Sequence, residues 1–172
     1  MNRKVLLWAS VAFLAAASAT AQTKISGTLK CKDAEPTHKL EVGDRAGHVM
    51  ELGKSNCTAS QPWELGGDKY KEGYSVGASE TSLTRVVVSG THVGTYESGD
   101  KAFAAYHNAI QLNNGKPTGD GRGTWSYTGG TGKFKGIKGK GTYKVTENSD
   151  GTVTVEVEGE YQLAASAAAP KK

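Results

Sequence analysis

Short segments in which apolar and polar residues alternate recur from Lys24 to Leu163, and turn residues separate them. Alternation with a period of two is typical of β-strands that bury one face, and no segment after Ala21 shows the apolar stripe of a helix. The sequence therefore predicts one all-β domain whose antiparallel strands form a closed barrel or a sandwich. The expected strands are 24–32, 39–42, 48–57, 70–79, 85–96, 101–112, 123–128, 138–146 and 152–163.

The two ends of the chain lack this pattern. A basic start at Arg3 and Lys4, an apolar run over 5–19 and the small residues Ala19 and Ala21 are typical of a cleaved secretory signal peptide. We expect residues 1–21 to be a leader, residues 22–163 to form the domain, and the Ala-rich residues 164–172 to be a disordered tail. The protein is then exported, to the periplasm or out of the cell, and keeps no membrane span; an uncleaved anchor is the alternative.

Cys31 and Cys57 are the two cysteines of the chain. In an exported protein such a pair is expected to form a disulfide, and a free thiol pair is the alternative. We expect no metal site at these cysteines. No phosphate-binding loop or zinc-protease motif occurs elsewhere, so we expect no cofactor.

The charge balance argues against a nucleic-acid partner. The chain holds 21 Lys and Arg against 17 Asp and Glu, and two of the basic residues would leave with the leader. Two more, Lys171 and Lys172, lie in the expected tail. The folded part is therefore close to neutral and offers no strong basic field.

The hairpin over 138–163 carries its apolar residues at odd positions. They share one face if the loop has an odd number of residues, and we expect its centre near Ser149. That register sets Lys140 opposite Glu158 on the outer face, in a ladder of opposite charges. The expected inner residues are Tyr143, Val145, Val153, Val155 and Val157.

The register of the hairpin over 85–112 decides which of its faces lines the interior. A two-residue turn at Ser98 and Gly99 would place Tyr96 opposite Lys101. We favour the face without Lys101 as the interior, because it is the more apolar. This expected inner face holds Val87, Thr91, Val93, Ala102, Ala104, Tyr106, Asn108 and Ile110. The opposite face holds Val88, His92, Tyr96, Phe103 and His107.

The segment YTGGTGKFKGIKGKGTY, residues 127–143, has an unusual spacing of glycines. It resembles the T-G-G-(small)-G-x-F-x-G-x-x-G segment of plant allene oxide cyclases and the G-G-T-G-x-F segment of dirigent proteins. The chain also looks like small exported bacterial proteins of unassigned role. The matching positions are Thr128, Gly129, Gly130, Thr131, Gly132, Phe134, Gly136 and Gly139.

This resemblance implies an eight-stranded, antiparallel, up-and-down β-barrel of the calycin-like kind, with a lumen for an apolar ligand. In those families the segment belongs to the barrel wall, so the resemblance implies a fold and not an activity. The catalytic carboxylate of the cyclases has no counterpart that we can place on this chain.

Five residues are candidates for contact with a ligand. Tyr106, Asn108 and Tyr127 would be polar groups in an apolar lumen, where each needs a partner, either a ligand or another group of the protein. His92 and His107 are neighbours in the expected register and would form an acid–base pair or hold a polar head group. The alternative is two exposed histidines on the outer wall.

Lys133 and Lys135 lie in the glycine-rich segment without an expected ion-pair partner. They would either contact an anion at the rim of the barrel or extend into solvent. No helix is expected after this segment, so it lacks the amide groups of a phosphate site.

These features support three hypotheses of function. The first is non-covalent binding of a small apolar or amphipathic molecule in the lumen, which we favour over catalysis. The second is a cyclase or isomerase of the allene oxide cyclase or dirigent type, which confines its substrate. The third is a structural protein of the cell envelope that uses its outer wall. The sequence leaves the ligand and the oligomeric state open.

Overall fold

The computed structural model describes residues 22–119 and 121–164. The leader expected over 1–21 lies outside these residues, as does the expected tail after Ala164. Within the described ranges, no helix is long and apolar enough to cross a membrane.

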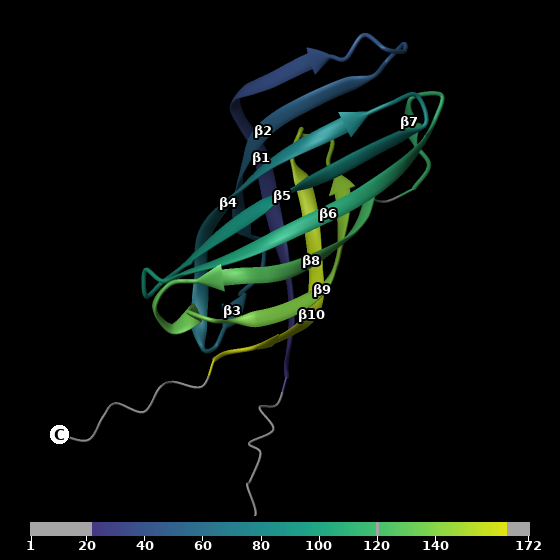
Figure 1. The fold of residues 1–172 in the computed structure, drawn as a ribbon. Helices are drawn as coiled ribbons and strands as arrows, with labels where there is room; N and C mark the ends of the chain where they lie inside the picture. Colours follow the sequence, from purple (N-terminus) through teal and green to yellow (C-terminus); the bar gives the residue numbers. More distant parts are fainter. Residues whose placement is uncertain (1–21, 120, 165–172) are drawn as a thin grey trace, which may run out of the picture.

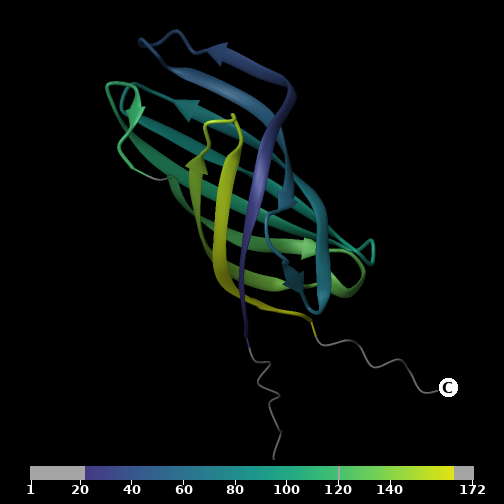
Figure 2. The ribbon, with the colours of Figure 1, turned by 180° about the vertical axis from the view of Figure 1, so that it is seen from behind.

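Eight long antiparallel strands of the described chain form a closed barrel (Figures 1 and 2). Each pairs with the next along the chain and the last pairs with the first, which gives the up-and-down topology that the resemblance implied. Closure pairs the edges that an open sheet would leave free. The strands are β1 (Thr23–Glu41), β2 (Val49–Ala59), β4 (Asp68–Thr81), β5 (Arg85–Tyr96), β6 (Lys101–Asn113), β8 (Gly121–Gly130), β9 (Lys138–Glu147) and β10 (Val153–Gln162).

Three short elements complete the described chain. Strand β3 (Glu64–Leu65) pairs with β4, strand β7 (Lys116–Pro117) pairs with β6, and the 3-10 turn η1 (Gly132–Phe134) joins β8 to β9. The alternation in the sequence thus predicted the long strands to within a few residues. One difference is that the strands expected over 24–32 and 39–42 form a single strand, β1, with a register shift between Ala34 and His38.

The hairpin of β5 and β6 has a register that differs by one residue from the expected one. Lys101 lies opposite Thr95 and not Tyr96, because the loop has three residues, with Gly99 in a left-handed conformation at φ +86°. Three-residue loops of this kind are common in hairpins. The odd loop turns the β5 half of the hairpin over, so His92 shares the inner face with Tyr106.

The hairpin of β9 and β10 keeps the expected inner face but has a different register. Its loop also ends in a left-handed glycine, Gly151, and centres on Asp150. Lys140 therefore lies opposite Glu160 rather than Glu158. A shift of two residues leaves every side chain on its predicted face.

The glycine-rich segment closes one end of the barrel. Phe134 of η1 is fully buried and lies 4.7 Å from Tyr96 between ring centroids. Asp100 accepts a hydrogen bond from the Lys133 amide (3.0 Å), and the Lys133 ammonium lies 3.0 Å from a carboxylate oxygen of Asp68, which is buried. Lys133 was expected to lack a partner, and this expectation is wrong. We call this end, which also buries Leu65 and Ile137, the plugged end.

The expected disulfide joins Cys31 of β1 to Cys57 of β2. The two residues face each other directly in the register of these strands, with their Cα atoms 4.1 Å apart. Both are buried. The bond therefore links neighbouring strands of the wall and closes a separation of 26 residues.

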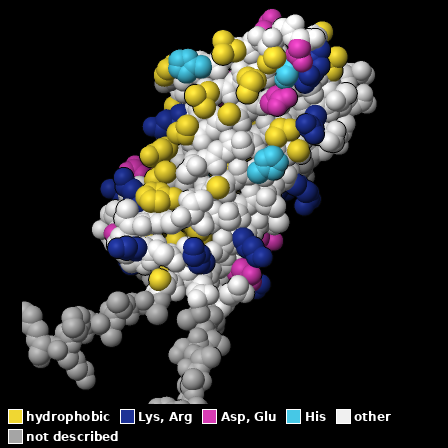
Figure 3. Space-filling model, in the orientation of Figure 1, with side chains coloured by type: hydrophobic (Ala, Val, Ile, Leu, Met, Phe, Trp, Pro, Cys, Tyr) yellow, Lys and Arg dark blue, Asp and Glu magenta, His cyan; other side chains and the backbone are white. Residues whose placement is uncertain are grey.

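The outer wall differs between its two halves. Over β2 and β4 the exposed apolar side chains include Met50, Leu52 and Val76. Figure 3 shows apolar side chains gathered along one flank of the face that it presents. The opposite half, over β9 and β10, carries lysine, threonine and glutamate at the outward positions, with Lys144 4.0 Å from Glu156. This second half is the charge ladder that the sequence predicted.

Candidate ligand-binding cavity

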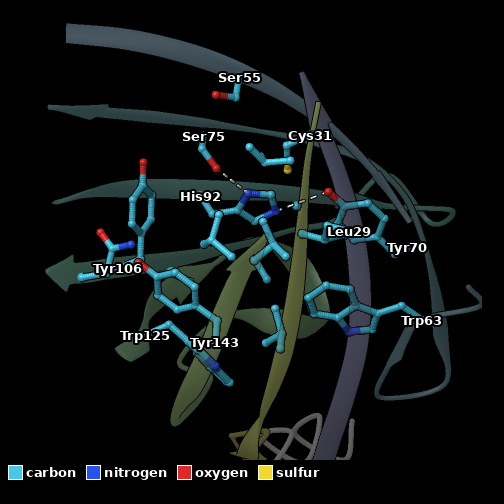
Figure 4. Close-up of a pocket in the computed structure, with 18 of the residues that line it drawn as sticks. Leu29, Cys31, Ser55, Trp63, Tyr70, Ser75, His92, Tyr106, Trp125 and Tyr143 are labelled. Atoms are coloured by element: carbon cyan, nitrogen blue, oxygen red, sulfur yellow. Dashed lines mark hydrogen bonds between the residues drawn. The ribbon is translucent and has the colours of Figure 1, made fainter. Parts of the chain in front are cut away.

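The lumen of the barrel contains a cavity of about 260 Å³ (Figure 4). Aromatic side chains from five strands and from the segment before β3 make up much of its lining. At the end away from the plug, the lining residues Val88, Ile110, Val145 and Val153 are only partly buried. We call this end the mouth. The aromatic residues of the lining are Trp63, Tyr70, Tyr96, Tyr106, Trp125, Tyr127 and Tyr143.

Several of these rings lie flat against the wall because the facing residue is glycine. The Tyr106 hydroxyl occupies the space that a Cβ atom on Gly77 or on Gly90 would need. Trp125 covers Gly159 in the same way, at 2.6 Å. Since any larger residue would push these rings into the lumen, the inward glycines keep the cavity open.

A row of polar residues runs across four neighbouring strands on the inner face of the wall. Asp33, Ser55, Ser75 and His92 are consecutive partners in the registers of β1, β2, β4 and β5, so their side chains share one face. Ser55 donates a hydrogen bond to Asp33 (2.6 Å). The Ser75 hydroxyl lies 3.0 Å from Nδ1 of His92. We call these four residues the polar row.

His92 is held as a neutral ring. Its Nε2 lies 3.3 Å from the Tyr70 hydroxyl, so both ring nitrogens have a hydroxyl partner (Figure 4). A neutral imidazole needs one donor and one acceptor, and two hydroxyl groups supply both. Burial lowers the pKa of His92 to about 4, because the lumen disfavours the charged form.

Burial also keeps the tyrosines of the lumen protonated. It raises the pKa of Tyr70, Tyr96, Tyr127 and Tyr143 above the ordinary value, and that of Tyr106 as well. The negative charge of Asp33 adds to the shift for Tyr106. The phenol groups are therefore neutral at physiological pH.

Asn108 is the most unusual polar group of the cavity. Asn108 is 5% exposed and lines the lumen. Its side-chain oxygen accepts no hydrogen bond from the described residues. A buried acceptor without a donor costs about 1–3 kcal/mol relative to a satisfied one. Trp63 Nε1 is likewise without an acceptor there, whereas Trp125 donates to the Glu158 carbonyl (3.1 Å).

The structure brings four of the five candidate residues together. Tyr106, Asn108, Tyr127 and His92 all line the cavity, while His107 is exposed on the outer wall. His92 and His107 therefore lie on opposite faces of the sheet and cannot form the acid–base pair that the expected register allowed. The cause is the three-residue loop described above.

The polar row and the place of Tyr70 in the lining were not predicted from the sequence. Their placement depends on the registers of four strands at once, and the turn between β5 and β6 differs from the expected one. A useful signal was present in the inward glycines, since Gly73, Gly77, Gly90 and Gly94 recur at even spacing beside large aromatic residues. Within the described ranges, no three His, Cys, Asp or Glu residues are grouped as a metal site would require.

Comparison with solved structures identifies the fold. The pterocarpan synthase dirigent protein PsPTS1 gives a TM-score of 0.52 at 15% identity, over 84% of this chain and 97% of that one. The related GePTS1 gives 0.50 at 14% identity, over 83% and 86%. A DUF3224-family protein of unknown function from Shewanella oneidensis gives 0.49 at 13% identity, over 84% and 99%.

The likenesses to the two dirigent proteins show a dirigent-like β-barrel fold, as the glycine-rich segment predicted. At such identities they show the fold alone. No model of a known protein family matches the sequence, and no curated protein is significantly similar to it.

Proposed function

We propose that this protein binds a small apolar or amphipathic molecule in the lumen of its barrel, without covalent chemistry. The observation that carries the proposal is the aromatic cavity of about 260 Å³ with the unpaired oxygen of Asn108 in its wall. Ligand sites are typically apolar hollows with a few polar groups that fix orientation. A wall built on inward glycines supports this, because larger residues at those positions would fill the space.

The environment of His92 favours binding over catalysis. Both of its ring nitrogens are engaged by hydroxyl groups of the protein, so neither faces a bound molecule unpartnered. No carboxylate contacts the ring among the described hydrogen bonds, so a Ser-His-Asp arrangement is absent there. A cyclase or isomerase would need another group of the lumen to move a proton.

A lumen-filling substitution tests the proposal. Ala104 and Ala105 are neighbours on β6 that face the lumen and the outer wall, respectively. We expect 1-ethylnaphthalene to bind the wild-type protein and Ala105→Phe with equal affinity, measured by tryptophan fluorescence, and Ala104→Phe to bind at least tenfold more weakly. Equal binding to all three proteins, or no binding to any, would falsify the proposal.

We also propose that the protein is exported after removal of residues 1–21. The disulfide supports this, because such bonds persist in oxidising compartments. Intact-mass measurement of the protein from its native host should give a chain that begins at Gln22 and has lost two hydrogens. A full-length, reduced chain in the cytosol would contradict the proposal.

A further inference from the structure

The charges around the cavity are unevenly distributed. Among the described residues, no Lys, Arg, Asp or Glu lines the cavity itself, and His92 is neutral. At the mouth, the carboxylate of Asp33 accepts a hydrogen bond from the lining residue Ser55 (2.6 Å). Asp33 is exposed, so solvent and an entering ligand reach it.

The basic residues next to Asp33 and Ser55 lie on the other face of the wall, whereas Lys39, further along β1, shares the face of its partner Glu51. Side chains alternate along a strand, so Lys32 and Lys54 point outward where Asp33 and Ser55 point inward. Lys54 lies over the outward ring of Tyr74, 4.6 Å from its centroid. Asp33 therefore has no basic partner at the mouth among the described ion pairs.

Tyr106 connects this carboxylate with the aromatic lining. Its ring runs from β6 across Gly90 to Gly77 of β4, and its hydroxyl is close enough to Asp33 for the carboxylate charge to act on it. The ring of Tyr143 stands edge-on to it, with centroids 6.2 Å apart and planes at 88°. Figure 4 shows Tyr106 and Tyr143 next to each other beside the cavity, and Ser55 and Ser75 together above them.

Asn108 supplies a second acceptor from the opposite wall. Four strand pairings separate β6 from β1 in either direction around the barrel, so Asn108 and Asp33 approach the lumen from opposite sides. The Asn108 oxygen has no donor in the described chain. One neutral acceptor in the lining and one carboxylate at the mouth thus lie on opposite sides of the aromatic lumen.

We propose that the molecule bound in the lumen is a hydrophobic cation, namely a protonated amine on an apolar body of about two fused rings. This inference rests on the proposed lumen binding and specifies its ligand class. The ammonium group offers donors to the Asn108 oxygen and to the Asp33 carboxylate, whose one described hydrogen bond comes from Ser55. Its charge is also attracted by the tyrosine faces. The apolar body fills the part of the cavity that Trp125 lines.

Three isosteric probes separate this inference from the proposed function. 1-Naphthylmethylamine carries the ammonium, 1-ethylnaphthalene replaces it by a methyl group, and 1-naphthylacetate replaces it by a carboxylate. We expect the amine to bind about tenfold more tightly than the hydrocarbon, and the acid to bind most weakly. Isothermal titration calorimetry at pH 7 measures all three.

Variants identify the groups responsible. Asp33→Asn should reduce the preference for the amine to about twofold or less while leaving the affinity for 1-ethylnaphthalene unchanged. Asn108→Leu should weaken the amine and strengthen the hydrocarbon. Glu158→Gln, which removes an exposed carboxylate from the outer wall, is the matched control and should change neither.

Each outcome decides between the two claims. Equal affinities for amine and hydrocarbon, tighter binding of the acid, or an amine preference that survives Asp33→Asn overturns the inference and leaves lumen binding intact. Failure of every probe to bind overturns both. Circular dichroism melts of the variants establish that each one is folded, and Asp33 is exposed enough for its substitution to be tolerated.

Discussion

The plugged end and the mouth of the barrel are formed by the same strands, but their buried polar groups differ in whether they have hydrogen-bond partners. At the plugged end the buried Asp68 accepts from Ser98 (2.5 Å) and pairs with Lys133, and Phe134 fills the remaining space. At the mouth no described residue donates to the Asn108 oxygen, and the lining residues are partly exposed. The comparison indicates that one end is fully packed, whereas the other leaves an open space and an unsatisfied acceptor, as the proposed ligand binding requires.

Removal of the plug should produce the largest effect. Phe134→Ala deletes a fully buried ring, so we expect the free energy of unfolding to fall by about 3–5 kcal/mol. Urea denaturation followed by tryptophan fluorescence measures the loss. Lys135→Ala, on an exposed neighbour, is the control and should change stability by less than about 0.5 kcal/mol. A loss below about 1 kcal/mol for Phe134→Ala would show that the end is not plugged by this ring.

Loss of the disulfide should have the next largest effect. Substitution of both Cys31 and Cys57 by alanine removes a cross-link between residues 26 positions apart in the sequence. We expect the free energy of unfolding to fall by about 3 kcal/mol. The same urea titration measures it, with reduced wild-type protein as the comparison. An unchanged midpoint would mean that these strands are held together by their packing alone.

The buried histidine should make the stability depend on pH. The pKa of His92 is about 4 in the folded chain and about 6.5 when unfolded, so only the unfolded chain takes up this proton between those values. Stability from this group is full above pH 6.5 and falls with pH by at most about 1.4 kcal/mol per unit.

Urea titrations at pH 7 and pH 5 measure this dependence. His92→Gln should remove most of the difference between the two, whereas His107→Gln, on the outer wall, should preserve it. The reverse result would place the buried histidine at position 107.

Asn108→Leu should have the smallest effect, and it should be stabilising. Leucine has the branching and the number of side-chain heavy atoms of asparagine, it fits beside the cavity, and it leaves no buried acceptor unpaired, so we expect a gain of about 1 kcal/mol. Thermal unfolding measures it. A loss of similar size would mean that Asn108 is satisfied in the folded chain and that the mouth resembles the plugged end.

The sequence predicted the wall of the barrel better than its interior. Alternation located the strands because each one buries a single face, and the odd positions of β9 and β10 remained inward despite a different register. In β5 the prediction failed because one extra residue in the loop before Asp100 exchanges the two faces. No local pattern distinguishes a two-residue from a three-residue loop in Glu97-Ser98-Gly99-Asp100.

The candidate site was predictable only where it depended on one strand. Tyr106 and Asn108 follow from the apolar face of β6 alone, and both line the cavity. The polar row depends on the registers of four strands at once. Small errors in register accumulate across strands, so such a row is visible only in the folded structure.

The most direct test of the difference between the two ends is a crystal structure with 1-ethylnaphthalene. We predict that the ring system lies in the lumen between Trp125 and the polar row, with Phe134 unmoved at the plugged end. A lumen filled by its own side chains, or a ligand bound only to the apolar flank of the outer wall, would contradict the account.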